Sequence, residues 1–307
     1  MSSESPLTGT NNVELIRSFD VQHIIDSWKE RFDIDISDEF DGIKQFYFYK
    51  CNDTKLKFFL PRSIAGSQSL YEKLGQISWY YMPKKWEYDA ALCDLRHADS
   101  VMEVGCGKGY FLEKLIKQHN KKACGIELNP GAILQASKRG IPVFHDNVFA
   151  FAAKNKDRYD AVCAFQVLEH VTNPRQFVSS LLDLVKVGGK IILSVPNAES
   201  FIRHEENGLL NLPPHHMTWW SQKTFQYFFK LFPMKIHCLR KEPLADYHTY
   251  FYLSVQMKRV NQWIPINKNR LEIFRAQAKK VLDNFPVLRK LIVGHTLYVC
   301  FVKIAGR

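Results

Sequence analysis

Short apolar runs alternate with helix-length amphipathic stretches from about Asp99 to the end of the chain. The apolar runs predict buried strands, and they are SVMEV (100–104), KACGIE (122–127), IPVFH, YDAVCAF (159–165), KIILSVP, MKIHCL and TLYVCFVKI (296–304). This alternation is typical of βαβ units, in which helices cover both faces of a mostly parallel sheet. Residues 241–294, between the last two runs, have room for a helical insertion.

The bulk composition is that of a globular protein. Of the 307 residues, 46% are hydrophobic and 24% are charged, and no run reaches the roughly eighteen apolar residues that a membrane-spanning helix needs. Residues 1–12 are small and polar, do not resemble a secretory signal, and are expected to be disordered. The aromatic-rich residues 13–97 predict an N-terminal extension that packs over the main domain, 98–307. The seven scattered cysteines favour reduced thiols and a cytoplasmic location.

The net charge of +11 suggests an anionic partner, and its distribution is uneven. Residues 241–307 contain twelve lysines and arginines against four acids, so this region contributes +8. Nucleic acid, a membrane surface, a phosphorylated substrate and a merely solvated basic face all remain open as explanations.

A glycine-rich turn, EVGCGKGY, follows the first strand of the alternating region. Gly105, Gly107 and Gly109 allow the backbone to turn tightly and to approach a ligand closely, and Glu103 precedes them. Tyr110 stands where the dinucleotide fingerprint GxGxxG requires glycine or alanine, which argues against that motif.

Two acids follow the next two strands. Glu127 ends the second strand about twenty residues on, where a carboxylate can accept hydrogen bonds from ribose hydroxyls. Asp146 follows the third strand, where a carboxylate can accept from the exocyclic amine of adenine. A glycine turn and two acids, each at the carboxyl end of a strand, predict a nucleoside-containing ligand.

The segments VMEVGCGKGYF, CGIELNP, HDN and AFQVLEHV resemble the successive motifs of class I S-adenosyl-L-methionine-dependent methyltransferases, over about 100–239 and on to the final strand. LEHV resembles the branch that acts on small molecules, which includes ubiquinone-pathway and sugar methyltransferases. The resemblance implies a Rossmann-like sheet of seven strands whose last hairpin is antiparallel. It also implies that helices within the N-terminal extension lie across the cofactor as a lid.

By the same resemblance, one set of residues would bind the cofactor. Glu103 and the glycine turn would face its methionine part, Glu127 its ribose, and Asp146 its adenine. The whole set comprises Glu103, Gly105, Gly107, Gly109, Tyr110, Glu127, Leu128, Asp146, Asn147, Gln166 and Tyr81. Gln166 would line the methyl-transfer pocket, and Tyr81 would touch the methionine end.

The candidates for a general base are Glu169 and His170 in LEHV, and His215 and His216 in the stretch LPPHHMTWWS. PPHH resembles a loop that closes the acceptor pocket in many of these methyltransferases. The alternatives are that LEHV only binds backbone groups and that PPHH is only a pocket wall. No metal site is predicted, because neighbouring side chains of an extended loop point apart and ligand spacing is lacking.

Three further interpretations concern the same stretch and the N-terminal extension. Trp219 and Trp220 are interpreted as packing residues, and Ser221 as the N-cap of the next helix. The segment YFYKCNDTKLKFFLP resembles a module that carries Cys-x-x-Cys in some sugar methyltransferases. Thr54 stands at the second cysteine position here, which argues against zinc.

The leading hypothesis is therefore a methyltransferase that acts on a small molecule or glycan, such as a sugar or a lipid-linked intermediate, with oxygen as the favoured methyl acceptor. An RNA or DNA methyltransferase that uses the basic C-terminal region is the alternative, and a non-enzymatic binding module is the third. A helical face of Leu271, Phe274, Ala278, Val281, Leu282 and Phe285 is expected to pack beside the sheet. Lys279 and Lys280 nearby raise the hypothesis of peripheral membrane contact. The oligomeric state stays open.

Overall fold

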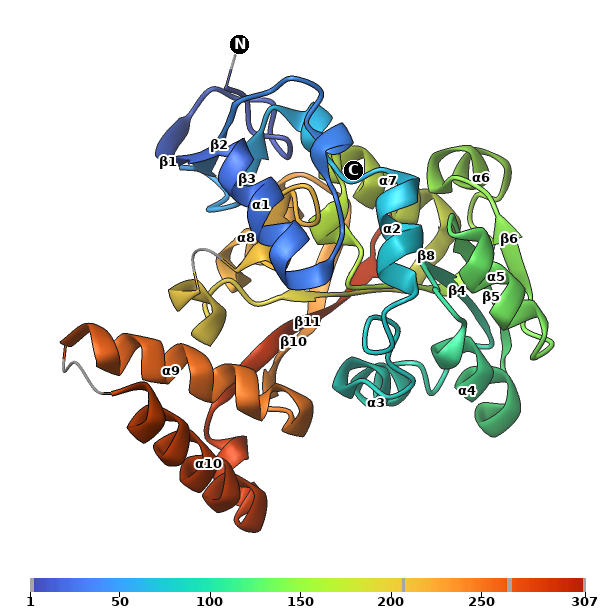
Figure 1. Ribbon diagram of the computed structural model, residues 1–307. Coiled ribbons are helices and arrows are strands. Elements are labelled where there is room, and N and C mark those ends of the chain that lie inside the picture. The colour runs from blue at the N-terminus through green and yellow to red at the C-terminus, as the bar shows by residue number, and fades with distance from the viewer. Residues whose placement is uncertain (1–2, 206–207, 264–266, 306–307) are drawn as a thin grey trace.

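The computed structural model describes residues 3–205, 208–263 and 267–305 (Figure 1). Its main body is a seven-stranded sheet in the order β10-β11-β8-β7-β4-β5-β6. The strands are β4 (Ser100–Val104), β5 (Lys122–Glu127), β6 (Val143–His145), β7 (Tyr159–Phe165), β8 (Val185–Pro196), β10 (Met234–Pro243) and β11 (Val293–Lys303). The five strands from β6 to β8 are parallel, whereas β11 runs antiparallel to β8 and to β10. The predicted Rossmann-like fold with an antiparallel last hairpin is confirmed.

Helices cover both faces of this sheet, and the strand period of two decides which residues meet them. Met102 and Val162 belong to a buried cluster that includes side chains of α6 and α7, while Val101 and Ala161 belong to a cluster with α3, α4 and α5. These helices are α3 (Trp86–Asp94), α4 (Tyr110–His119), α5 (Pro130–Ser137), α6 (Val148–Lys154) and α7 (Pro174–Leu184). The sheet is therefore buried on both sides, as its nearly unbroken apolar strands require.

The N-terminal extension builds a second, antiparallel sheet in the order β1-β2-β3-β9. Its strands are β1 (Val13–Asp20), β2 (Gln45–Cys51), β3 (Lys57–Leu60) and β9 (Thr218–Trp219), and its helices are α1 (Val21–Phe32) and α2 (Gln68–Gly75). An aromatic core holds it together, in which Phe48 stacks on Phe59 at 4.4 Å and meets Trp219 edge-on at 5.0 Å. The fourth strand comes from the TWW stretch, far along the chain, so this sheet is joined to the main domain.

The first residues differ from the expected disordered segment. Residues 3–12 form turns, and Leu7 is completely buried in the main core together with Leu56. Asn12 and Thr10 also donate hydrogen bonds to the Asp53 carboxylate. The mostly polar composition of this segment predicted disorder, but the buried Leu7 side chain anchors it. Residues 1–2 lie outside the described part of the chain.

The expected helical insertion consists of α9 (Thr249–Trp263), α10 (Lys268–Asn284) and α11 (Pro286–Lys290). Figure 1 shows α9 and α10 side by side and projecting away from the sheet. The expectation that the apolar face of α10 packs beside the sheet is wrong, because that face is divided. Leu282 is buried in a cluster with Leu253 of α9, whereas Phe274 and Phe285 are about half exposed.

Short helices complete the structure. The stretch 221–232 does not form one helix but divides into α8 (Gln222–Gln226) and a 3-10 turn. The 3-10 turns are Ser37–Glu39, Arg62–Ile64, Leu168–His170, Phe201–His204, Leu209–Asn211, Phe228–Lys230 and Asp246–His248. Within the described ranges, no helix has both the length and the apolar composition that crossing a membrane requires.

Candidate active site

A cavity of about 1400 Å³ opens at the carboxyl ends of the parallel strands. It lies where the strand order reverses between β4 and β7, the position at which open α/β sheets bind ligands. Four parts of the chain line it. They are the turns after β4, β5, β6 and β7, the residues in and beside α2, the loop with His215 and His216, and the insertion helices. The predicted site residues therefore come together at one place, with two exceptions described below.

The glycine turn after β4 has a backbone that only glycine adopts without strain. Gly105, Gly107 and Gly109 all have positive φ, at +71°, +51° and +73°. A Cβ on Gly107 would lie 2.7 Å from the ring of Tyr81, and one on Gly105 would lie 2.5 Å from Val167. The turn thus presents bare backbone to the cavity, with Tyr81 lying over it.

Glu127 connects the ends of β5 and β4. One carboxylate oxygen accepts from the Gly107 N–H at 2.7 Å, and the other accepts from the N–H groups of Leu128 and Asn129 at 2.8 and 2.9 Å. A carboxylate has about four acceptor positions, so the group keeps capacity for a ligand hydroxyl. The Leu128 side chain is about half exposed at the rim.

The third strand ends at the adjacent part of the cavity wall. Asp146 accepts from the Asn147 N–H at 2.7 Å, and the Asn147 side chain caps α6 through the Phe149 N–H. Both Asp146 and Asn147 line the cavity. Gly109 and Tyr110, by contrast, lie outside the lining, and the Tyr110 ring packs under the guanidinium of Arg139.

Glu103 is buried in the floor of the cavity, and burial raises the pKa of its carboxyl well above the ordinary value. One of its oxygens, Oε2, has no hydrogen-bond partner among the described residues. A buried polar atom without a partner is costly, and such atoms cluster where a ligand supplies the missing bond. Its place beside the glycine turn agrees with its predicted position.

Gln166, at the end of β7, has a positive φ of 56°, which is uncommon for a residue other than glycine. Its backbone N–H donates to Ser194, and its side-chain amide donates to Glu87 at 3.3 Å. Strained backbone of this kind concentrates at functional sites. Glu87 of α3 is almost completely buried, and the sequence pattern gave it no role because it lies within an aromatic run.

Three histidines gather on the opposite wall of the cavity. The ring centroids of His170, His215 and His216 lie 4.5 to 4.8 Å apart. His170 Nδ1 lies 2.6 Å from the His215 carbonyl, and His215 Nδ1 lies 2.9 Å from the Leu210 carbonyl. Because a carbonyl only accepts, each Nδ1 carries the proton, and each Nε2 is left as an acceptor.

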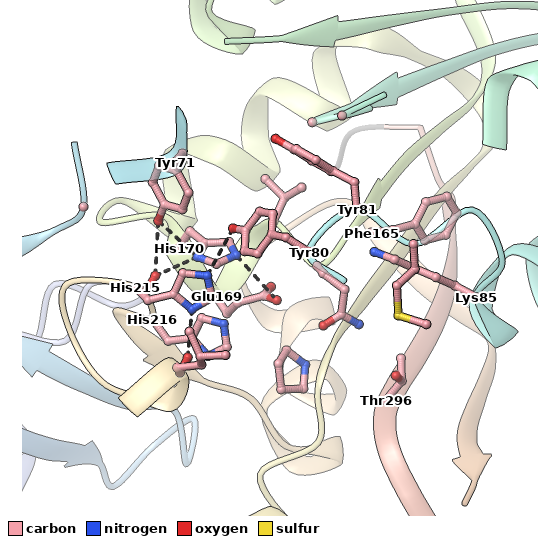
Figure 2. Close-up of a pocket in the computed structure, with 18 of the residues that line it drawn as sticks. Tyr71, Tyr80, Tyr81, Lys85, Phe165, Glu169, His170, His215, His216 and Thr296 are labelled. Carbon is pink, nitrogen blue, oxygen red and sulfur yellow. Dashed lines mark hydrogen bonds and ion pairs between the residues drawn. The ribbon is translucent and has the colours of Figure 1, made fainter. Parts of the chain in front are cut away.

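Two tyrosines and an acid surround the histidines (Figure 2). Tyr80 donates its hydroxyl to His215 Nε2 at 3.1 Å, and Tyr71 donates to the His215 carbonyl at 3.2 Å. Glu169 is completely buried, and neither carboxyl oxygen has a hydrogen-bond partner in the described ranges, although Oε1 lies 3.9 Å from His170 Nε2.

Burial makes this acid and its neighbouring base neutral. It raises the pKa of Glu169 to about 8 and lowers the pKa of His170 to about 4. The short Glu169–His170 distance is therefore not an ion pair near neutral pH, because each group keeps its uncharged form. The same cause lowers the pKa values of His215 and His216 well below the ordinary value.

The geometry of the PPHH loop differs from the expectation in one respect. Residues 213–215 form a turn rather than an extended segment, so His215 and His216 do not point apart but stack at an interplanar angle of 22°. Nitrogens of the three histidines lie within 4.8 Å of one another. These nitrogens are close enough to hold one metal ion, although Nδ1 of His170 and Nδ1 of His215 already donate to carbonyls.

The rest of the stretch packs as predicted. Trp220 is completely buried, Trp219 nearly so, and Ser221 caps α8 through the Thr224 N–H. The Met217 N–H and the Thr218 hydroxyl donate to the carbonyls of the LEH turn, at 2.8 and 3.3 Å. These bonds place the two candidate base motifs next to each other.

A second group of polar residues lines the far end of the cavity, where sequence reasoning proposed no site. The Tyr247 hydroxyl donates to Glu242 at 3.0 Å, and the rings of His248 and His295 lie 4.7 Å apart. Tyr250 and other side chains of α9 extend this wall. The signal available in the sequence was the position of His295 directly before the predicted last strand, TLYVCFVKI, although in the structure it belongs to β11.

Comparison with known proteins assigns the family. Residues 45–235 match the family model described as a methyltransferase domain, and since this range is more than half of the chain, the chain belongs to that family. It is 31% identical over 113 residues to the mitochondrial ubiquinone biosynthesis O-methyltransferase of Dictyostelium discoideum, covering 32% of this chain and 35% of that protein. It is 31% identical over 121 residues to the ubiquinone biosynthesis O-methyltransferase of Proteus mirabilis, covering 38% and 49%. The matched part thus spans only about a third to a half of these relatives.

Solved structures with a similar chain path include a SAM-dependent methyltransferase from Archaeoglobus fulgidus, with a TM-score of 0.47 and 16% identity over 78% of this chain and 95% of that one. Another is coclaurine N-methyltransferase bound to N-methylheliamine and SAH, with a TM-score of 0.45 and 15% identity over 71% and 72%.

Proposed function

We propose that this protein is an S-adenosyl-L-methionine-dependent methyltransferase that acts on a small molecule or glycan, with oxygen as the methyl acceptor. The observation that carries the proposal is the convergence of the glycine turn, Glu127 and Asp146 on one cavity, each from the end of a successive strand. Membership of the methyltransferase domain family and the names of the O-methyltransferase relatives support it.

The residues present fit this cofactor. The bare backbone at Gly107 and the unpartnered Glu103 oxygen suit its methionine part, Glu127 suits the ribose hydroxyls, and Asp146 suits the adenine amine. When bound, the cofactor supplies a methyl group already activated on a sulfonium. Tyr81, which lies over Gly107, acts as part of the lid from the N-terminal extension.

The protein then mainly has to align the acceptor, and such alignment contributes roughly 7–11 kcal/mol in favourable cases. The acceptor hydroxyl would lie against the wall that His170, His215 and His216 form, and it would lose its proton as its oxygen gains the methyl group and the demethylated cofactor is left. His215 Nε2 can take this proton, because the hydroxyl can replace Tyr80 as its hydrogen-bond donor. The lowered pKa of His215 makes it a weak base, but the hydroxyl becomes strongly acidic as its oxygen gains the methyl group. His170, held by the His215 carbonyl, orients the loop, and Glu169 stays neutral beside it.

Binding of the demethylated cofactor, S-adenosylhomocysteine, tests the proposal without knowledge of the acceptor. Glu127→Ala removes a charged hydrogen-bond acceptor and should weaken binding about ten- to a hundredfold in calorimetry. Gly107→Ala should weaken it too, because its Cβ collides with the Tyr81 ring. Gly140→Ala is the matched control, since Gly140 also has a positive φ, at +74°, but open space around it. If the unaltered protein binds no S-adenosylhomocysteine, a non-enzymatic module is the better explanation.

Separate His215→Ala and His216→Ala variants test the base. Transfer from tritium-labelled cofactor into a metabolite extract should fall by roughly a hundred- to ten-thousandfold for the variant that loses the base. Calorimetric binding of S-adenosylhomocysteine should stay unchanged in both. If neither variant loses methyl transfer, the PPHH loop only lines the acceptor pocket and supplies no base.

The alternative of a nucleic-acid methyltransferase rests on the basic C-terminal region alone, and the O-methyltransferase relatives do not favour it. The cytoplasmic location stays a prediction, since one relative is named mitochondrial.

A further inference from the structure

Exposed hydrophobic side chains concentrate on the helical insertion. Of the 22 large hydrophobic side chains that are exposed in the described residues, ten lie within residues 260–293. Trp263, at the end of α9, is 86% exposed, and Leu291, just after α11, is 80% exposed. Single exposed hydrophobic side chains are ordinary, but a cluster of this size on one projecting segment indicates a surface that binds a partner or a membrane.

One stripe of this surface runs along α10. Leu282 faces α9 and is buried, whereas Phe274, Val281 and Phe285 are 49%, 48% and 58% exposed. Phe274 and Val281 are separated by seven positions, which places them on one side of α10, and Phe285 directly follows this helix as its C-cap residue. The helix therefore has a packed side toward α9 and a second apolar side without cover.

The insertion is also strongly cationic. Residues 249–294 contain nine lysines and arginines and two acids. Both acids are engaged within the insertion, since Glu272 pairs with Arg275 and Asp283 pairs with Lys279 at 2.6 Å. Cations without a salt bridge to any described residue remain, and they are Arg259, Arg270, Lys280 and Lys290.

We propose that α9, α10 and α11 dock on an anionic lipid surface, with Phe274, Val281 and Phe285 inserted among the headgroups. An apolar stripe beside unneutralised cations is the pattern of helices that lie in a membrane interface. A tryptophan at the tip suits the same depth, because its ring is apolar and its N–H is polar. A second copy of this chain is disfavoured as the cover, because its insertion carries the same positive charge.

The cavity reaches this surface. Tyr250, Phe251 and Ser254 of α9 and Arg275 of α10 also line the cavity, so docking would bring this part of the cavity close to the lipid. The hypothesis of membrane contact through Lys279 and Lys280 is sharpened by the charges, because Lys279 pairs with Asp283 whereas Lys280 has no salt bridge to a described residue. The docking itself does not depend on the proposed methyl transfer.

The test is sedimentation of the full chain with vesicles, either phosphatidylcholine alone or an equal mixture with phosphatidylglycerol. The protein should bind only the anionic vesicles. Lys280→Glu/Lys290→Glu should lower partitioning about thirtyfold or more, since each cation near an anionic leaflet contributes about 1 kcal/mol. Phe274→Ser/Phe285→Ser should lower it at unchanged net charge.

Matched controls lie elsewhere on the surface. Lys154→Glu/Lys156→Glu changes the net charge equally and Phe229→Ser removes a ring that is 64% exposed, and both should leave binding intact. Circular dichroism confirms that each variant is folded. The proposal is overturned if the unaltered protein ignores anionic vesicles, or if the controls lose as much binding as the insertion variants. It is also overturned if Phe274→Ser/Phe285→Ser dissociates a dimer but does not weaken vesicle binding. The same holds if Lys280→Glu/Lys290→Glu weakens binding to RNA but not to anionic vesicles.

Discussion

At the scale of single residues, uncharged buried groups distinguish this cavity from an ordinary polar cleft. Glu169 has a pKa of about 8 in the folded protein against 4.5 for an exposed glutamate. The folded state keeps its proton in this interval while the unfolded chain has lost it. Glu169 therefore contributes stability that is fully present below about pH 4.5 and is lost as the pH rises toward 8.

Glu169→Gln should remove this pH dependence, because glutamine stays neutral. The free energy of unfolding should exceed that of the unaltered protein at pH 8, on the order of a few kcal/mol, and match it near pH 4. Urea unfolding across this range measures both. His170 acts with the opposite sign, since its lowered pKa of about 4 makes stability fall as the pH drops below 6.5. If the unfolding free energies of the unaltered protein and of Glu169→Gln change with pH in the same way, the burial of Glu169 is contradicted.

Gln166 offers a second test at this scale. Gln166→Gly should relieve about 1 kcal/mol of strain from the positive φ, but the lost hydrogen bond to the buried Glu87 costs about as much, so stability should change little while transfer of the labelled methyl group falls. Lys55→Gly is the matched control, since Lys55 has a φ of 62° in an exposed turn and should gain stability without losing transfer. Thermal unfolding and the transfer assay separate the two effects. Equal losses of transfer in both variants would argue against a functional role for Gln166.

At the scale of elements, the sequence predicts whatever depends on local periodicity. The strands β4 to β8 were found because their apolar runs are buried on both faces, and the acids at their ends were found because parallel strands end at one edge. The pairing of β9 with β3 was not predicted, since it joins Thr218 to Phe58 across 160 residues and leaves no local signal.

The divided face of α10 was missed for a related reason. A helical pattern of Leu271, Phe274 and Leu282 shows that a helix has an apolar side, but not whether a neighbour covers all of it. The histidine cluster was predicted in part. Its motifs are visible in the sequence, whereas the stacking of His215 on His216 depends on a turn that the sequence pattern did not show.

The loop with β9 also gives a prediction at this scale. Trp219 belongs to the aromatic core of the small sheet, and its indole N–H donates to the Asn211 carbonyl at 2.6 Å in the same loop as the histidines. Trp219→Ala should cost about 3–5 kcal/mol of unfolding free energy and also reduce methyl transfer, because the loop loses its anchor. Phe228→Ala is the matched control, since this buried ring packs in the main core away from the loop. If both variants lose unfolding free energy and also lose the same fraction of methyl transfer, Trp219 does not position the loop with the histidines.

At the scale of the whole molecule, the fold divides into a tightly buried body and a thinly packed projection. The main sheet has buried side chains on both faces, whereas few side chains of the α9–α10 hairpin are buried, among them Leu253, Val255 and Leu282. Segments with few buried apolar contacts open locally at a small free-energy cost. Amides of α10 should therefore exchange with deuterium well before those of β4 and β7.

Two ligands should protect different parts of this molecule from exchange. S-adenosylhomocysteine should slow exchange around the glycine turn and Glu127 and leave α10 unchanged, because the cofactor end of the cavity is built by the body. Anionic vesicles should slow exchange in α10 and leave the glycine turn unchanged, because docking covers only the insertion. Mass spectrometry of peptic fragments measures both patterns in one protein. Protection of α10 by the cofactor alone would mean that the hairpin closes over the cavity instead of facing a membrane.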